Sequence, residues 1–244
     1  MFRKLLTSVS VLVVFLGAMV GSPVVAQETD QPPAAAVVRM RFAPGATSAQ
    51  VDANLGRNRV QDYLIRVGGG QTMMLNLTAN NDSARVAVYP RFNRRSLRGG
   101  SSQTEWSGRV PWTGDYLIRV TGDISTQFSL NVTIPQRITF RRRAISAMVT
   151  GKTDAHRTVT YLLRARNGQV MTATLSSTVN VSPTAPVLGL TIYGYSDGIP
   201  LVRAEGDATS WSGVLSGTQD YVIEAKPAID TPITFTLGVT VTGR

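Results

Sequence analysis

Apolar and polar residues alternate with a period of two over most of the chain beyond its first 36 residues. In 63–67 the residues Tyr63, Ile65 and Val67 share one side, and 128–134 repeats the pattern. A period of two is typical of β-strands that bury one face and expose the other to water. Because no helical period is sustained beyond the N-terminal segment, the pattern predicts an all-β fold.

Turn-forming residues separate these alternating segments, at 68–70, 80–82, 99–100 and 113–115. Glycine, asparagine and aspartate favour the backbone angles of tight turns. Six to eight short strands in about 100 residues predict an antiparallel β-sandwich of the jelly-roll type. Parallel sheets would require crossover helices, for which the chain shows no pattern.

The chain repeats itself. Trp106-Ser107-Gly108 returns as Trp211-Ser212-Gly213, and Asp115-Tyr116 returns as Asp220-Tyr221. The matching positions lie 98 to 107 residues apart and keep their order. A unit of about 100 residues is long enough to bury a core of its own. We therefore predict two tandem β-sandwich domains, 38–135 and 138–244, with a boundary at Pro135 because proline ends a strand ladder.

The N-terminus has the features of an export signal. Arg3 and Lys4 precede a nearly continuous apolar segment, 5–20, and small residues precede a cleavage position after Ala26. This pattern predicts a signal peptide, 1–26, and a flexible leader, 27–37; a retained membrane anchor is the alternative. We expect a secreted protein, either periplasmic or on the extracellular cell surface. Without cysteine, it has no disulfides and no lipid-modified N-terminal cysteine.

The chain is basic, with a formal net charge of +10 that falls to +8 when Arg3 and Lys4 leave with the signal. Arginine supplies 22 of the 25 basic residues. A positive exported protein is attracted to anionic polymers of the cell envelope. We therefore expect a cell-envelope protein or an anionic polysaccharide as partner. Nucleic acid is not expected, because the chain is exported and lacks interleaved aromatic residues for base stacking.

Catalytic residue types are scarce. His156 is the single histidine, it lies in a polar segment, and there is no cysteine nucleophile. Asp115 and Asp220 could serve in acid–base chemistry, but as turn residues they are expected to accept backbone N–H bonds. We predict no enzymatic activity and no catalytic residue.

We expect no cofactor and no metal. Asp197, Glu205 and Asp207 could coordinate calcium through their oxygens, but they lack the dense spacing of a calcium loop.

Two basic segments are the candidate binding sites. The first segment has four arginines within eight residues, and the second lies at the start of the second repeat. Arginine binds carboxylate, sulfate and phosphate groups in bidentate fashion, so both segments predict contacts with anions. A solvated surface with no binding role is the alternative. Trp112 has glycine at the matching position of the second repeat, which favours an exposed contact. Trp106 and Trp211 occur in both repeats, which favours core packing over sugar stacking. The candidate binding residues are Arg91, Arg94, Arg95, Arg98, Trp112, Arg141, Arg142 and Arg143.

The repeated motifs resemble the bacterial pre-peptidase C-terminal domain family. The resemblance rests on a Gly-Gln-x-Met strand at 70–73, the Trp-Ser-Gly turn and the Asp-Tyr-x-Ile strand at 115–118, and it covers about residues 38–243. It implies secreted jelly-roll modules that accompany exported enzymes or stand alone on the cell surface. The same opening and strand are similar to periplasmic inhibitors of g-type lysozyme.

We therefore predict an exported, non-catalytic binding or accessory protein made of two such modules. The alternatives are a structural subunit of a surface layer or larger complex, and an inhibitor of g-type lysozyme. The inhibitor family carries an arginine- and asparagine-rich loop before its final strand, whereas the matching segments here, 121–126 and 226–231, have a different composition.

Overall fold

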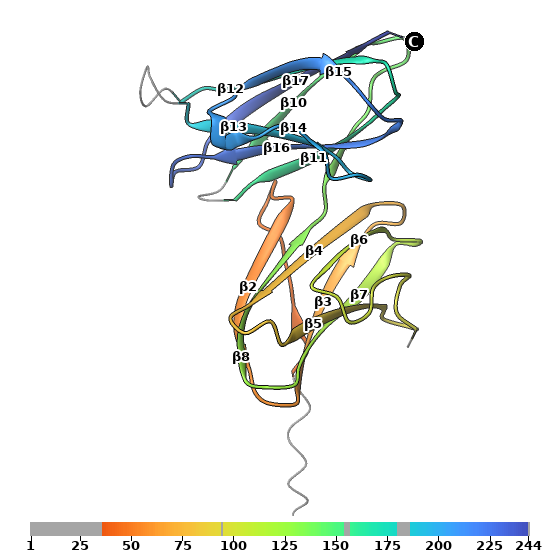
Figure 1. Ribbon diagram of the computed structural model, residues 1–244, viewed down its shortest axis with the longest axis vertical. Coiled ribbons are helices and arrows are strands. Elements are labelled where there is room, and N and C mark those ends of the chain that lie inside the picture. The colour runs from red at the N-terminus through yellow and green to blue at the C-terminus, as the bar shows by residue number, and fades with distance from the viewer. Residues whose placement is uncertain (1–35, 94, 154–156, 180–185, 244) are drawn as a thin grey trace, which may run out of the picture. The chain divides into compact units, whose positions relative to one another are not determined.

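The structure is a computed structural model that describes residues 36–93, 95–153, 157–179 and 186–243. The predicted signal peptide and nearly all of the predicted leader lie outside these residues. The described chain forms two β-sandwiches, which confirms the predicted all-β fold (Figure 1). Within the described ranges no helix is long and apolar enough to cross a membrane.

The first sandwich consists of two four-stranded sheets, ordered β1-β3-β7-β5 and β2-β8-β4-β6. Its strands are β1 (Val38–Arg39), β2 (Ser48–Leu55), β3 (Arg59–Val67), β4 (Thr72–Ala79), β5 (Ala84–Pro90), β6 (Glu105–Arg109), β7 (Gly114–Gly122) and β8 (Thr126–Thr133).

The second sandwich has a five-stranded sheet, β14-β13-β16-β11-β9, and a four-stranded sheet, β10-β17-β12-β15. Its elements are β9 (Gln136–Ile138), β10 (Ser146–Lys152), β11 (Val159–Ala165), β12 (Val170–Ser177), β13 (Leu188–Gly194), β14 (Pro200–Val202), the 3₁₀ helix η1 (Ala204–Gly206), β15 (Ser210–Val214), β16 (Gln219–Pro227) and β17 (Thr234–Thr242).

The two sandwiches repeat one topology. The order β1-β3-β7-β5 corresponds to β9-β11-β16-β13, and β2-β8-β4-β6 corresponds to β10-β17-β12-β15. Only β14 and η1 lack a counterpart among the described residues of the first sandwich. The predicted duplication therefore holds at the level of strand order, and it is deeper than the shared motifs alone indicate.

One strand pair in each sandwich departs from the antiparallel pattern. The first strand of each sandwich pairs in parallel, β1 with β3 and β9 with β11. A parallel pair requires a crossover between its strands. Here a strand of the opposite sheet provides it, β2 in one sandwich and β10 in the other, so no helix is needed.

Residues 136 and 137 also differ from the sequence-based expectation, which left them between the domains. With Ile138 they form β9, which pairs with β11 from Gln136↔Tyr161 to Ile138↔Leu163. Only Ile134 and Pro135 separate β8 from β9. A connection this short means that the opening strand of the second sandwich follows directly on the closing strand of the first.

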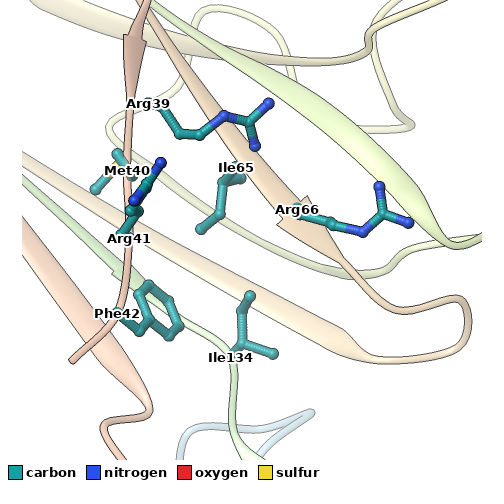
Figure 2. A pocket seen from close by; sticks show the side chains of 7 residues that line it. All are labelled: Arg39, Met40, Arg41, Phe42, Ile65, Arg66 and Ile134. Atoms are coloured by element: carbon teal, nitrogen blue, oxygen red, sulfur yellow. The ribbon is translucent and has the colours of Figure 1, made fainter. Parts of the chain in front are cut away.

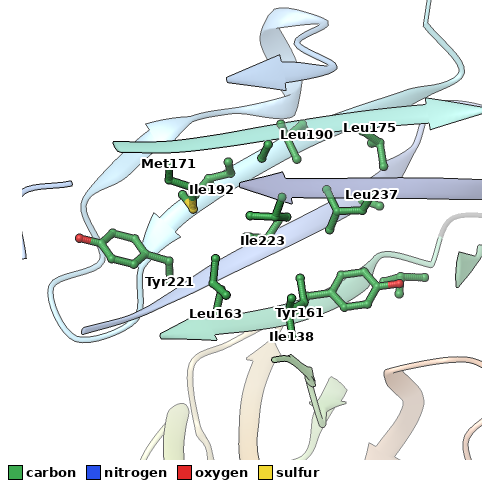
Figure 3. Close-up of a cluster of buried hydrophobic side chains, with 14 of the residues drawn as sticks. Ile138, Tyr161, Leu163, Met171, Leu175, Leu190, Ile192, Tyr221, Ile223 and Leu237 are labelled. Carbon is green, nitrogen blue, oxygen red and sulfur yellow. The ribbon is translucent and has the colours of Figure 1, made fainter. Parts of the chain in front are cut away.

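Each sandwich buries the apolar side of its alternating strands. In β3, Tyr63, Ile65 and Val67 join the first core, and Figure 3 shows side chains from both sheets of the second sandwich directed toward one another. Burying each such leucine, isoleucine or tyrosine contributes roughly 1.5–3 kcal/mol. Because each sandwich has a core of its own, each can hold its surface residues in fixed positions.

The Trp-Ser-Gly motif has a packing explanation in both sandwiches. Side chains at i and i+2 of a strand share one face. A Cβ at Gly108 would lie 2.6 Å from Trp106 Cζ2, and one at Gly213 would lie 2.5 Å from Trp211 Cζ2. Trp106 is buried and Trp211 packs partly buried against its core, which confirms a structural role for the repeated tryptophans.

Candidate anion-binding site

The short strand β1 is held at the edge of its sheet by an ion pair. Its Met40 N–H, just past the strand, donates to Leu64 O at 2.9 Å. The Arg39 guanidinium donates to both carboxylate oxygens of Asp115 on β7, Nη2 to Oδ2 at 2.8 Å and Nη1 to Oδ1 at 3.3 Å. This bidentate geometry is the strong form of an arginine–carboxylate contact.

Two further arginines surround the same carboxylate. Arg91 Nη1 lies 3.3 Å from Asp115 Oδ2, and the Arg91 N–H donates to Asp115 O at 3.0 Å. Arg66 on β3 stands in register with Asp115 across the β3–β7 pair. The hydrogen bond from Arg39, assisted by Arg91 and by the charge of Arg66, holds the pKa of Asp115 below its ordinary value.

A pocket of about 620 Å³ opens beside this ion pair. Figure 2 shows the side chains of Arg39, Arg41 and Arg66 around Ile65, with Phe42 and Ile134 to one side. The arginines reach the rim because residues 39–42 alternate, with Met40 buried while Arg39 and Arg41 are exposed. The pocket therefore combines an apolar wall with a basic rim.

The rim carries more positive charge than its surroundings neutralise. No carboxylate lines the pocket among the described residues, and Asp115, which pairs with the lining residue Arg39, is already bound by Arg39 and Arg91. The side chains of Arg41 and Arg66 make no hydrogen bond and no ion pair within the described chain, although the charge of Arg66 acts on Asp115. Their guanidinium groups can bind a carboxylate, sulfate or phosphate, and the apolar wall strengthens such contacts by excluding water.

Comparison with the second sandwich shows which of these contacts belong to the shared fold and which occur only at this pocket. Arg137 on β9 binds Asp220 in the same bidentate way, at 2.7 and 3.0 Å, and Arg164 stands in register with Asp220 as Arg66 does with Asp115. The Arg137 hydrogen bond likewise lowers the pKa of Asp220. We call these two ion pairs, Arg39–Asp115 and Arg137–Asp220, the arginine clamps. Because both sandwiches have one, the clamp is part of the fold.

The surplus charge, in contrast, belongs to the first sandwich alone. The position that matches Arg41 holds Thr139, because β1 and β9 take the same place beside β3 and β11. The position that matches Arg91 holds Tyr195, whose N–H donates to Asp220 O at 2.9 Å as that of Arg91 does to Asp115 O. Arg41 and Arg91 are thus not required by the topology.

The two aspartates of the clamps bind different partners from those that we expected. We expected Asp115 and Asp220 to accept backbone N–H bonds in turns. Their carboxylates instead accept side-chain hydrogen bonds from Arg39 and Arg91, and from Arg137. In the sequence Arg39 lies 76 residues from Asp115, Arg91 lies 24 residues from it, and Arg137 lies 83 residues from Asp220, so no local pattern could pair them.

The structure brings Arg91 of the first basic segment to the candidate site and leaves its neighbours elsewhere. Arg95 and Arg98 are exposed in the connection between β5 and β6 and do not line the pocket, and Arg94 lies outside the described residues. Trp106 Nε1 donates to Arg98 O at 3.2 Å, which ties this connection to the core.

Trp112 is exposed, as expected, with 48% of its surface accessible. It lies in the connection from β6 to β7, and its backbone oxygen accepts the Tyr116 hydroxyl at 2.8 Å. It does not line the arginine pocket.

Arg141, Arg142 and Arg143 form an exposed turn between β9 and β10 of the second sandwich. The Ala144 N–H donates to Arg141 O at 2.9 Å, and Arg143 takes a left-handed φ of 65°. Arg141 lines a separate hollow on β10, β12 and β17.

Sequence reasoning missed Arg39, Arg41 and Arg66, which line the pocket. A signal for two of them exists, since Arg39-Met40-Arg41-Phe42 alternates basic and apolar residues as an edge strand with one wet side does. The contribution of Arg66 required knowledge of the strand register. The clustering of all three is a property of the fold.

Two of the three carboxylates considered for calcium have other partners. Asp197 accepts the Ile199 N–H at 2.9 Å and Gln219 Nε2 at 2.6 Å, and Glu205 pairs with Lys226 at 3.0 Å. In the described ranges no three acidic or histidine side chains gather as metal ligands do. His156 lies outside them.

No family model matches the chain, and no curated protein sequence matches it. The resemblance to pre-peptidase C-terminal domains therefore stays a prediction.

Solved structures do show similarity to part of the chain. The periplasmic inhibitor of g-type lysozyme from Aeromonas hydrophila is 25% identical, with a TM-score of 0.35 over 40% of this chain and 95% of that one. The inhibitors from Escherichia coli, as a mutant, and from Salmonella Typhimurium are each 18% identical, with TM-scores of 0.32 over 40% of this chain and 96% of theirs. These similarities assign no activity to this chain.

Proposed function

We propose that this protein is an exported, non-catalytic binding protein that holds an acidic group of a cell-envelope partner in the arginine pocket of its first sandwich. The observation that carries this proposal is the pair Arg41 and Arg66, whose guanidinium groups form no hydrogen bond and no ion pair within the described chain and flank an apolar wall. A carboxylate seated there gains charge-assisted hydrogen bonds in a partly dry site.

The clamp gives the pocket its rigidity. Arg39 is fixed by Asp115, so the rim loses little side-chain freedom when a ligand binds. Of the two, Arg66 has a counterpart in Arg164, whereas Arg41 occurs in only one of the two copies of the topology, which separates Arg41 from the requirements of folding. Both points favour a binding role over a solvated surface.

The test is the affinity of the mature protein for polyglutamate, a polymer of carboxylates, measured by fluorescence anisotropy. We expect Arg41→Gln/Arg66→Gln to weaken binding about thirtyfold, because two contacts to a charged group are lost and each is worth roughly 1 kcal/mol in a partly exposed site. Thermal unfolding checks that the variant keeps its fold.

The matched control is Arg57→Gln/Arg59→Gln, which removes the same charge from exposed positions of the same sandwich. If both double variants weaken binding equally, the affinity reflects net charge and the pocket has no special part in it. If neither does, the pocket is not the binding site.

We propose inhibition of g-type lysozyme as a second candidate function, since the Gly-Gln-x-Met strand at 70–73 resembles that of such inhibitors. A lytic assay with purified g-type lysozyme tests it directly. Stoichiometric loss of lysis supports the inhibitor function, and full lysis in the presence of excess protein removes it. The result is independent of polyglutamate binding.

A further inference from the structure

The outer face of the sheet β10-β17-β12-β15 in the second sandwich is covered by hydroxyl groups. On each strand, every second side chain points away from the core and is exposed or half-buried. None of these outward residues is acidic, and most are serine or threonine: Ser146, Met148, Thr150, Lys152, Val170, Thr172, Thr174, Ser176, Ser210, Ser212, Val214, Thr234, Thr236, Gly238, Thr240 and Thr242.

Four of these hydroxyls form a row across the sheet. Ser146 pairs in register with Thr240, Thr240 with Thr172, and Thr172 with Ser212. The Thr172 and Ser212 hydroxyls lie 2.8 Å apart. Neighbouring strands are about 4.8 Å apart, so the row is about 14 Å long. Such a row can exchange hydrogen bonds with a linear molecule that carries hydroxyls along its length.

A hollow of about 640 Å³ lies next to this row. Gly238 stands at its centre, in register with Met148 on one side and Thr174 on the other. A Cβ at Gly238 would meet only Thr174 O, at 3.9 Å, so the space above the glycine is open. Met148 is 76% exposed and provides an apolar edge.

Basic residues border this face. Arg141 lines the hollow, and Arg142 and Arg143 are exposed in the same turn. Lys152 lies on the outward side of β10. Since the outward residues include no carboxylate, an approaching anion meets positive charge without opposing negative charge.

The corresponding face of the first sandwich is also hollowed, but it is acidic. Asn131 takes the place of Gly238 within the β8 ladder, in register with Gln50 and Asn76. Asn76 Nδ2 donates to Glu105 Oε1 at 3.0 Å, and Asp52 lies on the same side of β2. The glycine and the absence of acid are therefore not consequences of the shared topology.

We propose that this face binds a strand of an anionic polysaccharide, one whose sugars carry carboxylate or sulfate groups. The hydroxyl row bonds to the sugar hydroxyls, Met148 packs against the apolar face of a sugar ring seated over Gly238, and Arg141 binds the acidic substituent. The site uses different residues, and a different sandwich, from the arginine pocket, so it does not rest on the function proposed above.

The test is the affinity of the mature protein for alginate oligosaccharides, measured by calorimetry with neutral dextran as comparison. Gly238→Val fills the hollow with a side chain that favours strands and has room to fit, so the fold is retained. We expect this variant to bind alginate about tenfold more weakly. Arg141→Gln is expected to weaken alginate binding several-fold and to leave the weak binding of dextran unchanged.

The matched control is Ser129→Val, which adds a valine to the outer face of β8 in the first sandwich and is expected to bind as the parent does. Equal binding by Gly238→Val and the parent overturns the proposal, as does a parent that does not bind alginate. If Arg41→Gln/Arg66→Gln abolishes alginate binding and Gly238→Val retains it, the polysaccharide is held by the arginine pocket; this face then has no role and the first proposal stands.

Discussion

At the scale of single residues, the buried tyrosines differ in what their hydroxyls contact. The Tyr116 hydroxyl donates to Trp112 O and the Tyr221 hydroxyl to Gly217 O, each at 2.8 Å and four residues upstream. This arrangement matches the tyrosine corner of other β-sandwiches. Tyr161, in contrast, has a buried hydroxyl with no hydrogen-bond partner in the described part of the chain, and burial raises its pKa to about 12.

Phenylalanine substitutions should separate these two cases. Tyr221→Phe removes a made hydrogen bond and leaves Gly217 O without its donor, so we expect a loss of about 1 kcal/mol in the free energy of unfolding. Tyr161→Phe removes only a desolvated hydroxyl, so the free energy of unfolding should stay the same or rise. Urea unfolding followed by tryptophan fluorescence measures both. A loss of similar size in Tyr161→Phe would show that its hydroxyl has a partner in solution.

At the scale of elements, the arginine clamps hold strands too short to be stable alone. The ladder of β1 with β3 has two residue pairs and that of β9 with β11 has three. Each short strand pairs with one strand, β3 or β11. Its clamp reaches across that strand to the next one in the sheet, β7 or β16. The arginine of each clamp thus holds the edge strand in place where few backbone hydrogen bonds do so.

The clamps predict acid sensitivity. The pKa values of Asp115 and Asp220 are lowered by their arginines, so the folded state binds fewer protons than the unfolded state in this range. Their stabilisation is fully present above the unfolded pKa of about 3.9 and is lost as pH falls through the lower folded pKa. We expect Asp115→Asn/Asp220→Asn to have a slightly lower free energy of unfolding than the parent at pH 7, because ion pairs with exposed arginines are screened by solvent.

The difference in the free energy of unfolding between parent and variant should then shrink as the pH falls below about 4. Denaturant unfolding at a series of pH values measures it. An offset between the two proteins that stays constant down to pH 2 would show that the carboxylate charge contributes nothing.

The elements also show what a sequence can and cannot reveal. Period-two alternation predicted long strands such as β3 and β8, because each buries one whole face. It did not reveal β1 or β9, since two or three residues contain too little pattern. The arginine pocket joins Arg39, Arg66 and Ile134, which are adjacent only once strand register is known. The hollow over Gly238 likewise depends on which residues stand beside it on β10 and β12.

At the scale of the whole molecule, the basic net charge sets how the protein meets its partners. A formal charge of +10, or +8 without Arg3 and Lys4, attracts polyanions over distances that depend on ionic strength. At about 0.1 M salt this attraction is screened beyond about 10 Å. Local contacts in the pocket and on the sheet face must therefore provide the selectivity.

Salt should weaken polyanion binding in a graded way. Between about 50 and about 500 mM sodium chloride we expect the affinity for alginate to fall about tenfold or more, because long-range attraction and ion pairing are both screened. Affinity for neutral dextran should change little over the same range. Calorimetric titrations at four salt concentrations provide the measurement. Alginate affinity that is independent of salt would rule out ionic recognition.

The brevity of the connection at Ile134 and Pro135 has an evolutionary and practical consequence. Each sandwich opens with its own clamped strand and closes with a long strand inside one of its sheets, so the strands of each sheet all come from one copy. A gene segment cut at this joint could be appended, removed or exchanged without leaving a sheet incomplete. Longer arrays, in which individual copies diverge to hold different ligands, would then require only new surface residues.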